Sequence, residues 1–291
     1  MSTTKVAFLG LGRMGSPIAQ NLAAKPNFVV KGWNRTQQDR PLVKLAQKGG
    51  VELAPTIQAA VADADITFVC VGDVRDVDRV IFGEGGIVHY AKPGSLVIDF
   101  STIGPQAARD ISQKLQPYNL HFLDAPVSGG DIGAQQGTLT VMVGGNKADF
   151  DRALPVFNAI GNKIVHCGAV GSGQAIKLCN QVLCSIHMIA LTEAMLLAQQ
   201  LGVDPHLAID ICNSGAGGSW ALANLAPKAV TGDFKPGFMV KHILKDLRLV
   251  DENRQELDLP GVTLANQMFE SVRDLGGAEQ GTQAMIRAYN S

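Results

Sequence analysis

The chain lacks any excess of charge. Its 25 basic and 26 acidic residues, among 291 in total, leave a formal charge of −1. Proteins that bind nucleic acid or an anionic membrane surface usually carry a strongly basic face. The balanced composition therefore predicts neither kind of partner, although it leaves room for small local sites that bind anions.

Metal-ligating patterns are missing as well. The five cysteines are an odd number, and their spacing fits neither a disulfide framework nor a zinc site. The six histidines show no H-E-x-x-H or similar ligand spacing. We therefore expect no disulfide framework and no bound metal.

A long hydrophobic run near the start is also absent. Residues 1–5 lead directly into the first predicted strand, which leaves no room for a signal peptide. No wholly apolar run reaches the roughly 20 residues of a membrane span. We expect a cytoplasmic protein with no membrane partner. Its 46% hydrophobic content and its length predict substantial cores in two domains.

The first half of the chain alternates short strand-like runs with helical ones. Such alternation is typical of an α/β fold with a parallel sheet and helices on both faces. Ligands of these sheets bind beyond the carboxyl ends of the strands. The predicted strands are residues 6–9, 28–33, 66–71, 96–99, 121–123 and 138–143.

The second half has a different pattern. Residues 174–201 contain neither proline nor glycine and predict one long helix, with Gly202 at its end and Pro205 opening the next helix. No convincing strand run follows. We therefore predict a doubly wound first domain over residues 1–167 and an all-helical domain for substrate binding and dimerisation over residues 168–291, linked by the long helix.

A glycine-rich turn follows the first predicted strand and opens a helix. Gly10 permits the tight turn, Gly12 lets backbone amides approach a pyrophosphate, and Gly15 allows close packing of helix on strand. The helix N-terminus adds a positive end for the phosphates. This arrangement predicts a Rossmann-type site for NAD or NADP. The turn consists of Gly10, Leu11, Gly12, Arg13, Met14 and Gly15.

The residue that reads the adenosine ribose is expected 19 positions after Gly15, and here no acidic residue stands there. The chain has Asn34, Arg35 and Thr36 instead. An acid would bond the 2′-hydroxyl of NAD and repel a phosphate, whereas these side chains suit the 2′-phosphate of NADP. NADP is therefore the predicted cofactor, with NAD the less favoured choice. The alternative is that Arg35 is an ordinary surface charge.

A polar cluster interrupts the apolar long helix near its start. Lys177, Asn180 and Gln181 stand at positions i, i+3 and i+4, so they share one face. A solvated stripe is the ordinary alternative. The glycines of residues 171–173 allow another backbone or a ligand to approach closely. The positive end of the helix dipole also disfavours the ammonium form of Lys177, which suits a group that transfers protons.

A second segment, residues 124–130, follows a predicted strand and combines a hydroxyl with glycine amides. Turns of this composition form concavities that bind carboxylates, although an ordinary proline and glycine turn has the same composition.

These blocks together resemble the β-hydroxyacid dehydrogenase family, which includes 3-hydroxyisobutyrate dehydrogenases and tartronate, glyoxylate and succinic semialdehyde reductases. The resemblance spans essentially the whole chain in the family's order. The matching blocks are residues 8–15, 124–130 with 137–140, 171–180 and 245–246.

The resemblance implies a role for each matching position. Lys177 would be the catalytic lysine, and Asn180 would help to orient the substrate. Thr102 would lie beside the nicotinamide, and Lys245 would lie near the cofactor and the substrate. From the sequence alone, however, Lys245 could equally belong to a solvated helix face together with Lys241, His242 and Arg248. The carboxylate loop would be formed by Ser128, Gly129 and Gly130.

One departure concerns the strand end under the cofactor, where many relatives have Leu-Pro and this chain has Val71 and Gly72. That contact is therefore less well specified by the resemblance. Family members form dimers and sometimes tetramers, so we also expect a homodimer or homotetramer.

The leading prediction is an NADPH-dependent reductase of a small carboxylate-bearing aldehyde, such as glyoxylate or succinic semialdehyde. The alternative is NAD(P)-dependent oxidation of a β-hydroxy acid such as 3-hydroxyisobutyrate or L-serine. Imine reductases share the architecture but generally lack a lysine at position 177. A non-enzymatic binding module is disfavoured for the same reason, since it would be expected to have lost that lysine.

Overall fold

The computed structural model describes residues 3–36 and 41–289. Its contacts divide the chain into two compact units, Met1–Lys177 and Leu178–Ser291. The sequence predicts a boundary ten residues earlier, before the long helix, whereas the contacts group the first turns of that helix with the first unit. The predicted division into a dinucleotide-binding domain over residues 1–167 and a domain for substrate binding and dimerisation over residues 168–291 stays a prediction.

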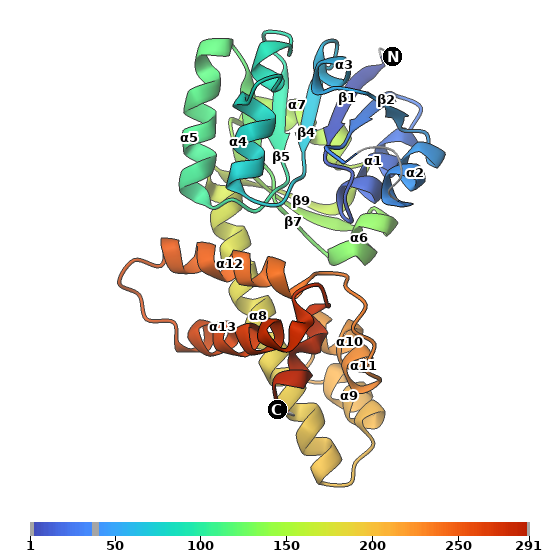
Figure 1. Cartoon of the computed structure of the whole chain (residues 1–291), viewed down its shortest axis with the longest axis vertical. Coiled ribbons are helices and arrows are strands. Elements are labelled where there is room, and N and C mark those ends of the chain that lie inside the picture. Colours follow the sequence, from blue (N-terminus) through green and yellow to red (C-terminus); the bar gives the residue numbers. More distant parts are fainter. Residues whose placement is uncertain (1–2, 37–40, 290–291) are drawn as a thin grey trace. The chain divides into compact units, whose positions relative to one another are not determined.

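The first unit is built on one mixed sheet in which parallel pairs dominate (Figure 1). Its strand order is β3-β2-β1-β4-β5-β6-β8-β7, and β9 pairs with β8. All pairs from β3 to β6 are parallel, whereas β8 runs antiparallel to both β6 and β7. The strands are β1 (Thr4–Leu9), β2 (Phe28–Trp33), β3 (Glu52–Leu53), β4 (Ile66–Val69), β5 (Leu96–Asp99), β6 (His121–Asp124), β7 (Val127–Ser128), β8 (Leu139–Gly145) and β9 (Gly161–Gly168).

Helices cover both faces of this sheet, which confirms the doubly wound prediction. Alternate residues of β1 show the division, because Phe8 belongs to one core and Ala7 and Leu9 belong to the other. Helices α1 (Gly15–Ala23), α2 (Pro41–Lys48), α6 (Gly130–Gln136) and α7 (Lys147–Phe157) cover the Phe8 face. Helices α3 (Ile57–Val61), α4 (Val74–Phe82) and α5 (Pro105–Leu115) cover the other.

The sequence analysis did not predict three of the observed strands. β3 has only two residues, β7 lies inside the segment that predicted a turn, and β9 mixes polar and apolar residues without clear alternation. The predicted strand 66–71 ends at Val69, and the chain continues through Cys70, whose amide still bonds the carbonyl oxygen of Leu9 at 2.9 Å. Short strands of this kind depend on the neighbour with which they pair.

The long helix α8 (Ser172–Gln200) has 29 residues. Gly202 ends it with a φ of +73°, and Pro205 opens α9 (Pro205–Ser214) as predicted. By length and composition alone α8 would qualify as a membrane span. Its polar side chains Gln174, Gln181 and Thr192 are nevertheless buried in the protein, which is typical of a central helix of a globular fold.

The second unit packs its helices around an apolar core that includes Leu247, Phe269 and Met285. Within its described residues the one β-type pairing is a single bridge between Met239 and Gly281, as expected for an all-helical unit. Its further elements are α10 (Trp220–Asn224), α11 (Ala226–Val230), α12 (Val240–Asn253), α13 (Pro260–Val272), and the short helical segments η3 (Arg273–Gly277) and η4 (Thr282–Tyr289).

Candidate active site

The glycine turn between β1 and α1 has the geometry that its sequence predicts. Gly10 has a φ of +107°, and a Cβ there would lie 2.2 Å from the carbonyl oxygen of Cys70. A Cβ at Gly15 would lie 1.9 Å from the Gly10 oxygen, so helix and strand are in close contact. A Cβ at Gly12 would meet nothing within 4 Å. The turn therefore offers open space at the position that would face a pyrophosphate.

Asn34 follows β2 and braces this turn. Its side-chain oxygen accepts a hydrogen bond from the Leu11 amide at 3.0 Å, and its Nδ2 donates to the Thr36 carbonyl at 2.9 Å. Arg35, the next residue, extends into solvent and pairs with Asp76 at 2.8 Å. In the glycine turn itself Arg13 is exposed and Met14 is half-buried. The predicted ribose-reading segment thus lies beside the glycine turn, where the fold requires it.

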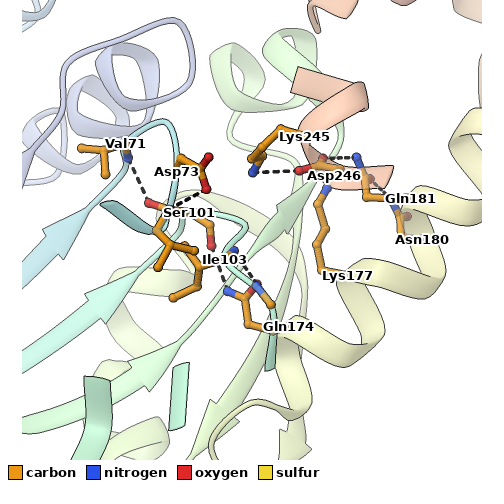
Figure 2. Close-up of polar contacts among 12 residues, drawn as sticks. Val71, Asp73, Ser101, Ile103, Gln174, Lys177, Asn180, Gln181, Lys245 and Asp246 are labelled. Carbon is orange, nitrogen blue, oxygen red and sulfur yellow. Dashed lines mark hydrogen bonds and ion pairs between the residues drawn. The ribbon is translucent and has the colours of Figure 1, made fainter. Parts of the chain in front are cut away.

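The loop that carries Thr102 is held by a buried glutamine of α8 (Figure 2). Gln174 is fully buried, and its Nε2 donates to the Ser101 carbonyl at 2.8 Å. Its Oε1 accepts from the amides of Ile103 and Gly104 at 3.0 and 3.1 Å. These three bonds span Thr102 on both sides, so they set the position of the loop expected beside the nicotinamide.

The adjacent strand end is tied to the same loop. The amide of Val71 donates to Oγ of Ser101 at 2.9 Å, and the Ser101 amide donates to Oδ1 of Asp99 at 2.8 Å. Gly72 follows and is exposed. The ends of β4 and β5 therefore form one connected edge, as expected for the ligand edge of a parallel sheet.

A buried carboxylate joins the end of β6 to the start of α8. Asp124 accepts hydrogen bonds from the amides of Gly171 at 2.7 Å and Gln174 at 2.9 Å. A Cβ at Gly144 or Gly173 would lie within 3 Å of this carboxylate, so both glycines make room for it. Burial raises the pKa of Asp124, and the hydrogen bonds from backbone amides partly offset that effect. Asp124 therefore anchors the first turn of the helix that carries Lys177.

Lys177 is buried within the first unit. Its Nζ donates to the carbonyl oxygen of Val127 at 2.8 Å. Val127 and Ser128 form β7, which pairs with β8, and Ser128 is half-buried. Gly129 and Gly130 follow with φ values of +129° and +62°. The fold thus brings the predicted proton donor next to the predicted carboxylate loop.

The second unit contains a connected group of polar side chains. Nδ2 of Asn180 donates to Oε1 of Gln181 at 2.8 Å, and Nε2 of Gln181 donates to Oδ2 of Asp246 at 2.5 Å. Oδ1 of Asp246 pairs with Nζ of Lys245 at 2.8 Å (Figure 2). Asp246 is buried, with 1% of its surface exposed. The buried acid therefore orients both Lys245 and, through Gln181, the amide of Asn180.

His242 lies on α12 near this group. Burial lowers its pKa below the ordinary 6.5, and the charges of Lys241 and Lys245 lower it further. Its ring stacks on Phe238, with ring centroids 5.9 Å apart. The imidazole therefore binds a proton more tightly in the unfolded chain than in the folded protein. His242 stabilises the fold above pH 6.5 and loses that contribution as the pH falls through its lowered pKa in the folded state.

The variant His242→Gln tests this linkage. It should be less stable than the parent at pH 7.5, and the difference should shrink at pH 5, where the parent has to bury a charged ring. Thermal unfolding at pH 5, 6 and 7.5 measures the effect. The same change at the exposed His206 should leave the pH dependence of the parent unaltered. A constant gap between His242→Gln and parent at all three values would contradict the interpretation.

Comparison with known proteins covers both units. The profile of the NAD binding domain of 6-phosphogluconate dehydrogenase matches residues 5–168, and that described as NAD-binding of NADP-dependent 3-hydroxyisobutyrate dehydrogenase matches residues 171–289. The chain belongs to the β-hydroxyacid dehydrogenase family. It is an NAD(P)-dependent oxidoreductase with the family's two-part architecture.

Several relatives align along the full chain. An uncharacterised oxidoreductase of Synechocystis is 59% identical and covers 99% of both chains. The 2-hydroxy-3-oxopropionate reductase of Escherichia coli is 32% identical, covering 98% of this chain and 96% of its own. The structure of Mycobacterium tuberculosis 3-hydroxyisobutyrate dehydrogenase with L-serine is 32% identical, with a TM-score of 0.85 over 99% of this chain and all of its own. Such β-hydroxyacid dehydrogenases act on small hydroxy and oxo acids.

Sequence reasoning missed several supporting residues of this oxidoreductase. No function was predicted for Asp124, although it lies in the segment predicted to bind a carboxylate. None was predicted for Gln174 either, which lies three residues before Lys177. Gln181 shared the polar face of α8, yet its bond to Asp246 joins residues 65 apart. For Gln174 and Gln181, the available signal was a polar side chain on the otherwise apolar helix α8. Their partners became visible only in the fold.

Proposed function

We propose that this protein reduces a small carboxylate-bearing aldehyde, such as glyoxylate or succinic semialdehyde, to the hydroxy acid with NADPH. The observation that carries the proposal is the bond from Lys177 Nζ to the Val127 carbonyl, directly beside Ser128. A proton donor and a loop suited to a carboxylate therefore lie within one unit. A substrate held by its carboxylate would present its carbonyl group to the lysine.

The cofactor, when bound, supplies the hydride. The residues of the chain have separate tasks. The Ser128 hydroxyl and the amides of Gly129 and Gly130 bind the substrate carboxylate, and Lys177 donates a proton to the carbonyl oxygen as negative charge develops there. The role of Asn180 in orienting the substrate remains a prediction from the family resemblance. The placement of Lys245 near the cofactor remains a prediction from the family resemblance.

Cofactor choice depends on Arg35 in this proposal. The chain has no acidic residue among the three that follow β2, and a guanidinium there suits a 2′-phosphate. We expect Arg35→Ala to weaken NADPH binding by about tenfold, in line with a charge-assisted contact of roughly 1.5 kcal/mol, and to leave NADH binding within about twofold. Fluorescence titration of both cofactors measures this. Equal changes for the two would contradict the assignment.

Turnover measurements test the reaction itself. The purified protein is incubated with NADPH, or with NADH in parallel, and glyoxylate, succinic semialdehyde, tartronate semialdehyde or methylmalonate semialdehyde. Reduction of one of these, markedly faster with NADPH, supports the proposal. Activity only in the reverse direction, on 3-hydroxyisobutyrate or L-serine, would favour the alternative dehydrogenase. That alternative has support from the related structure that contains L-serine.

We also propose a homodimer or homotetramer. The second unit exposes large apolar side chains on α8, on α9 and in the turn between them, which is costly for a monomer in water. Light scattering coupled to size-exclusion chromatography determines the subunit number, and a monomer at micromolar concentration would contradict the proposal. The exposed residues are Leu183, Leu197, Leu201, Leu207 and Ile211.

A further inference from the structure

Arg35, the residue predicted to select the cofactor, forms an ion pair with an acidic side chain. Arg35 follows β2, and its Nη1 lies 2.8 Å from Oδ1 of Asp76, which is 41 residues away in the sequence. Asp76 lies in the first turn of α4, after β4. Strand β1 lies between β2 and β4 in the sheet, so this pair bridges the strand that leads into the glycine turn. The sheet edge beside the glycine turn therefore contains an acidic side chain, Asp76 from α4, although none of the three residues after β2 is acidic.

The local backbone holds Asp76 at this position. Asp73 caps α4 with its side chain accepting the Val74 amide at 2.7 Å, and the Asp76 amide donates to the Asp73 carbonyl at 3.0 Å. A Cβ at residue 72 would lie 3.1 Å from Oδ2 of Asp76, which is tighter than an ordinary contact. Gly72 therefore makes room for the acid at the position where many relatives have proline.

We propose that Asp76 is a specificity-determining residue that limits the preference for NADPH over NADH. This inference rests on the proposed role of Arg35. A 2′-phosphate has to draw the guanidinium away from Asp76, or share it, and it also meets the negative charge of the carboxylate. A 2′-hydroxyl meets no such repulsion and can donate a hydrogen bond to a carboxylate. The Arg35–Asp76 pair therefore reduces the affinity for NADPH without reducing that for NADH.

The size of the effect follows from the exposure of the pair. The side chains of Arg35 and Asp76 are 65% and 30% exposed, so water screens their attraction. Exposed pairs of this kind are worth up to roughly a fivefold change in an equilibrium constant. Removal of the repulsion from the phosphate, which solvent also screens, adds a smaller factor of about twofold. We therefore expect about a three- to tenfold gain in NADPH affinity when the charge of Asp76 is removed.

The test compares Kd values of NADPH and NADH for the intact protein and for Asp76→Asn, with Asp76→Ser as a second variant. The Kd of NADPH should fall about three- to tenfold, and that of NADH should not fall. Asp78→Asn is the matched control, because it removes the same charge from the same helix but from a pair with Lys114. It should leave both Kd values within about twofold.

A double-mutant cycle separates this inference from the proposed function. In the Arg35→Ala background, Asp76→Asn should gain less for NADPH than in the parent, because no guanidinium is released. An unchanged or higher NADPH Kd in both Asp76 variants, with Arg35→Ala still weakening NADPH, would overturn the role of Asp76 alone. NADPH binding unaffected by Arg35→Ala would instead overturn the cofactor assignment on which it rests.

Discussion

Lys177→Ala should lower kcat for the proposed aldehyde reduction by about 10²- to 10⁴-fold, which is the usual contribution of a positioned general acid. The substitution removes the ammonium that lies beside Ser128 but leaves the glycine turn and the Arg35 segment intact. NADPH affinity should therefore stay within about twofold of the parent. Steady-state kinetics and fluorescence titration measure the two quantities.

The control for this prediction is Lys163→Ala, which removes an exposed lysine from β9 of the same unit. It should retain activity close to that of the parent. The Lys177 variant should also lose the feature of the pH–rate profile that reports the ionisation of the proton donor. Activity of Lys177→Ala within severalfold of the parent would eliminate the lysine as the general acid.

Asp124→Ala should reduce the free energy of unfolding by about 2–4 kcal/mol. It leaves the amides of Gly171 and Gln174 buried without their acceptor, and each such loss costs roughly 1–3 kcal/mol. The start of α8 then loses its anchor on β6, so kcat should fall as Lys177 loses its position. Urea denaturation and steady-state kinetics on the same preparations test both consequences.

Asp110→Ala is the matched control, since Asp110 is exposed on α5 and accepts a hydrogen bond from the side chain of Gln106, one helical turn away. It should change the free energy of unfolding by less than about 0.5 kcal/mol. An equally small change for Asp124→Ala would show that the buried carboxylate does not anchor the helix.

The raised pKa of Asp124 adds a dependence on pH. Because the folded state holds the proton more tightly than the unfolded chain, this group stabilises the fold most below 3.8 and loses that contribution as the pH rises through its folded value. Asp124→Asn cannot titrate. The free energy of unfolding of Asp124→Asn should therefore fall further below that of the parent as the pH falls from 7 toward 4. Urea denaturation at several pH values measures this difference.

Local patterns were sufficient for much of the fold. The glycine turn needs little beyond its own residues, since Gly10 requires a positive φ and Gly15 requires contact without a side chain. The absence of glycine and proline over residues 174–201 was enough to predict α8 to within two residues at its start. The short strands β3 and β7 were missed because pairing with β2 and β8 defines them.

The residues that hold the candidate site in place were harder to predict from the sequence. Gln174 and Asp124 lie 50 residues apart, and neither has a local pattern that reveals the other as its partner. Arg35 was identified from its place after β2, but its pairing with Asp76 depends on how β4 and α4 lie next to β2. Spacing along the chain contains no information about such contacts.

The sequence by itself determined the dinucleotide turn, the long helix, the family and the identity of the proton-donating candidate, because each depends on one or more short blocks of residues that are recognisable along the chain. Only the tertiary structure decided which side chains hold those residues in place. Asp124 anchors the start of α8, Gln174 bonds the residues on both sides of Thr102, and Asp76 forms an ion pair with Arg35. The physical reason is that hydrogen bonds and ion pairs act over a few ångströms of space, and folding alone brings such distant residues within that range.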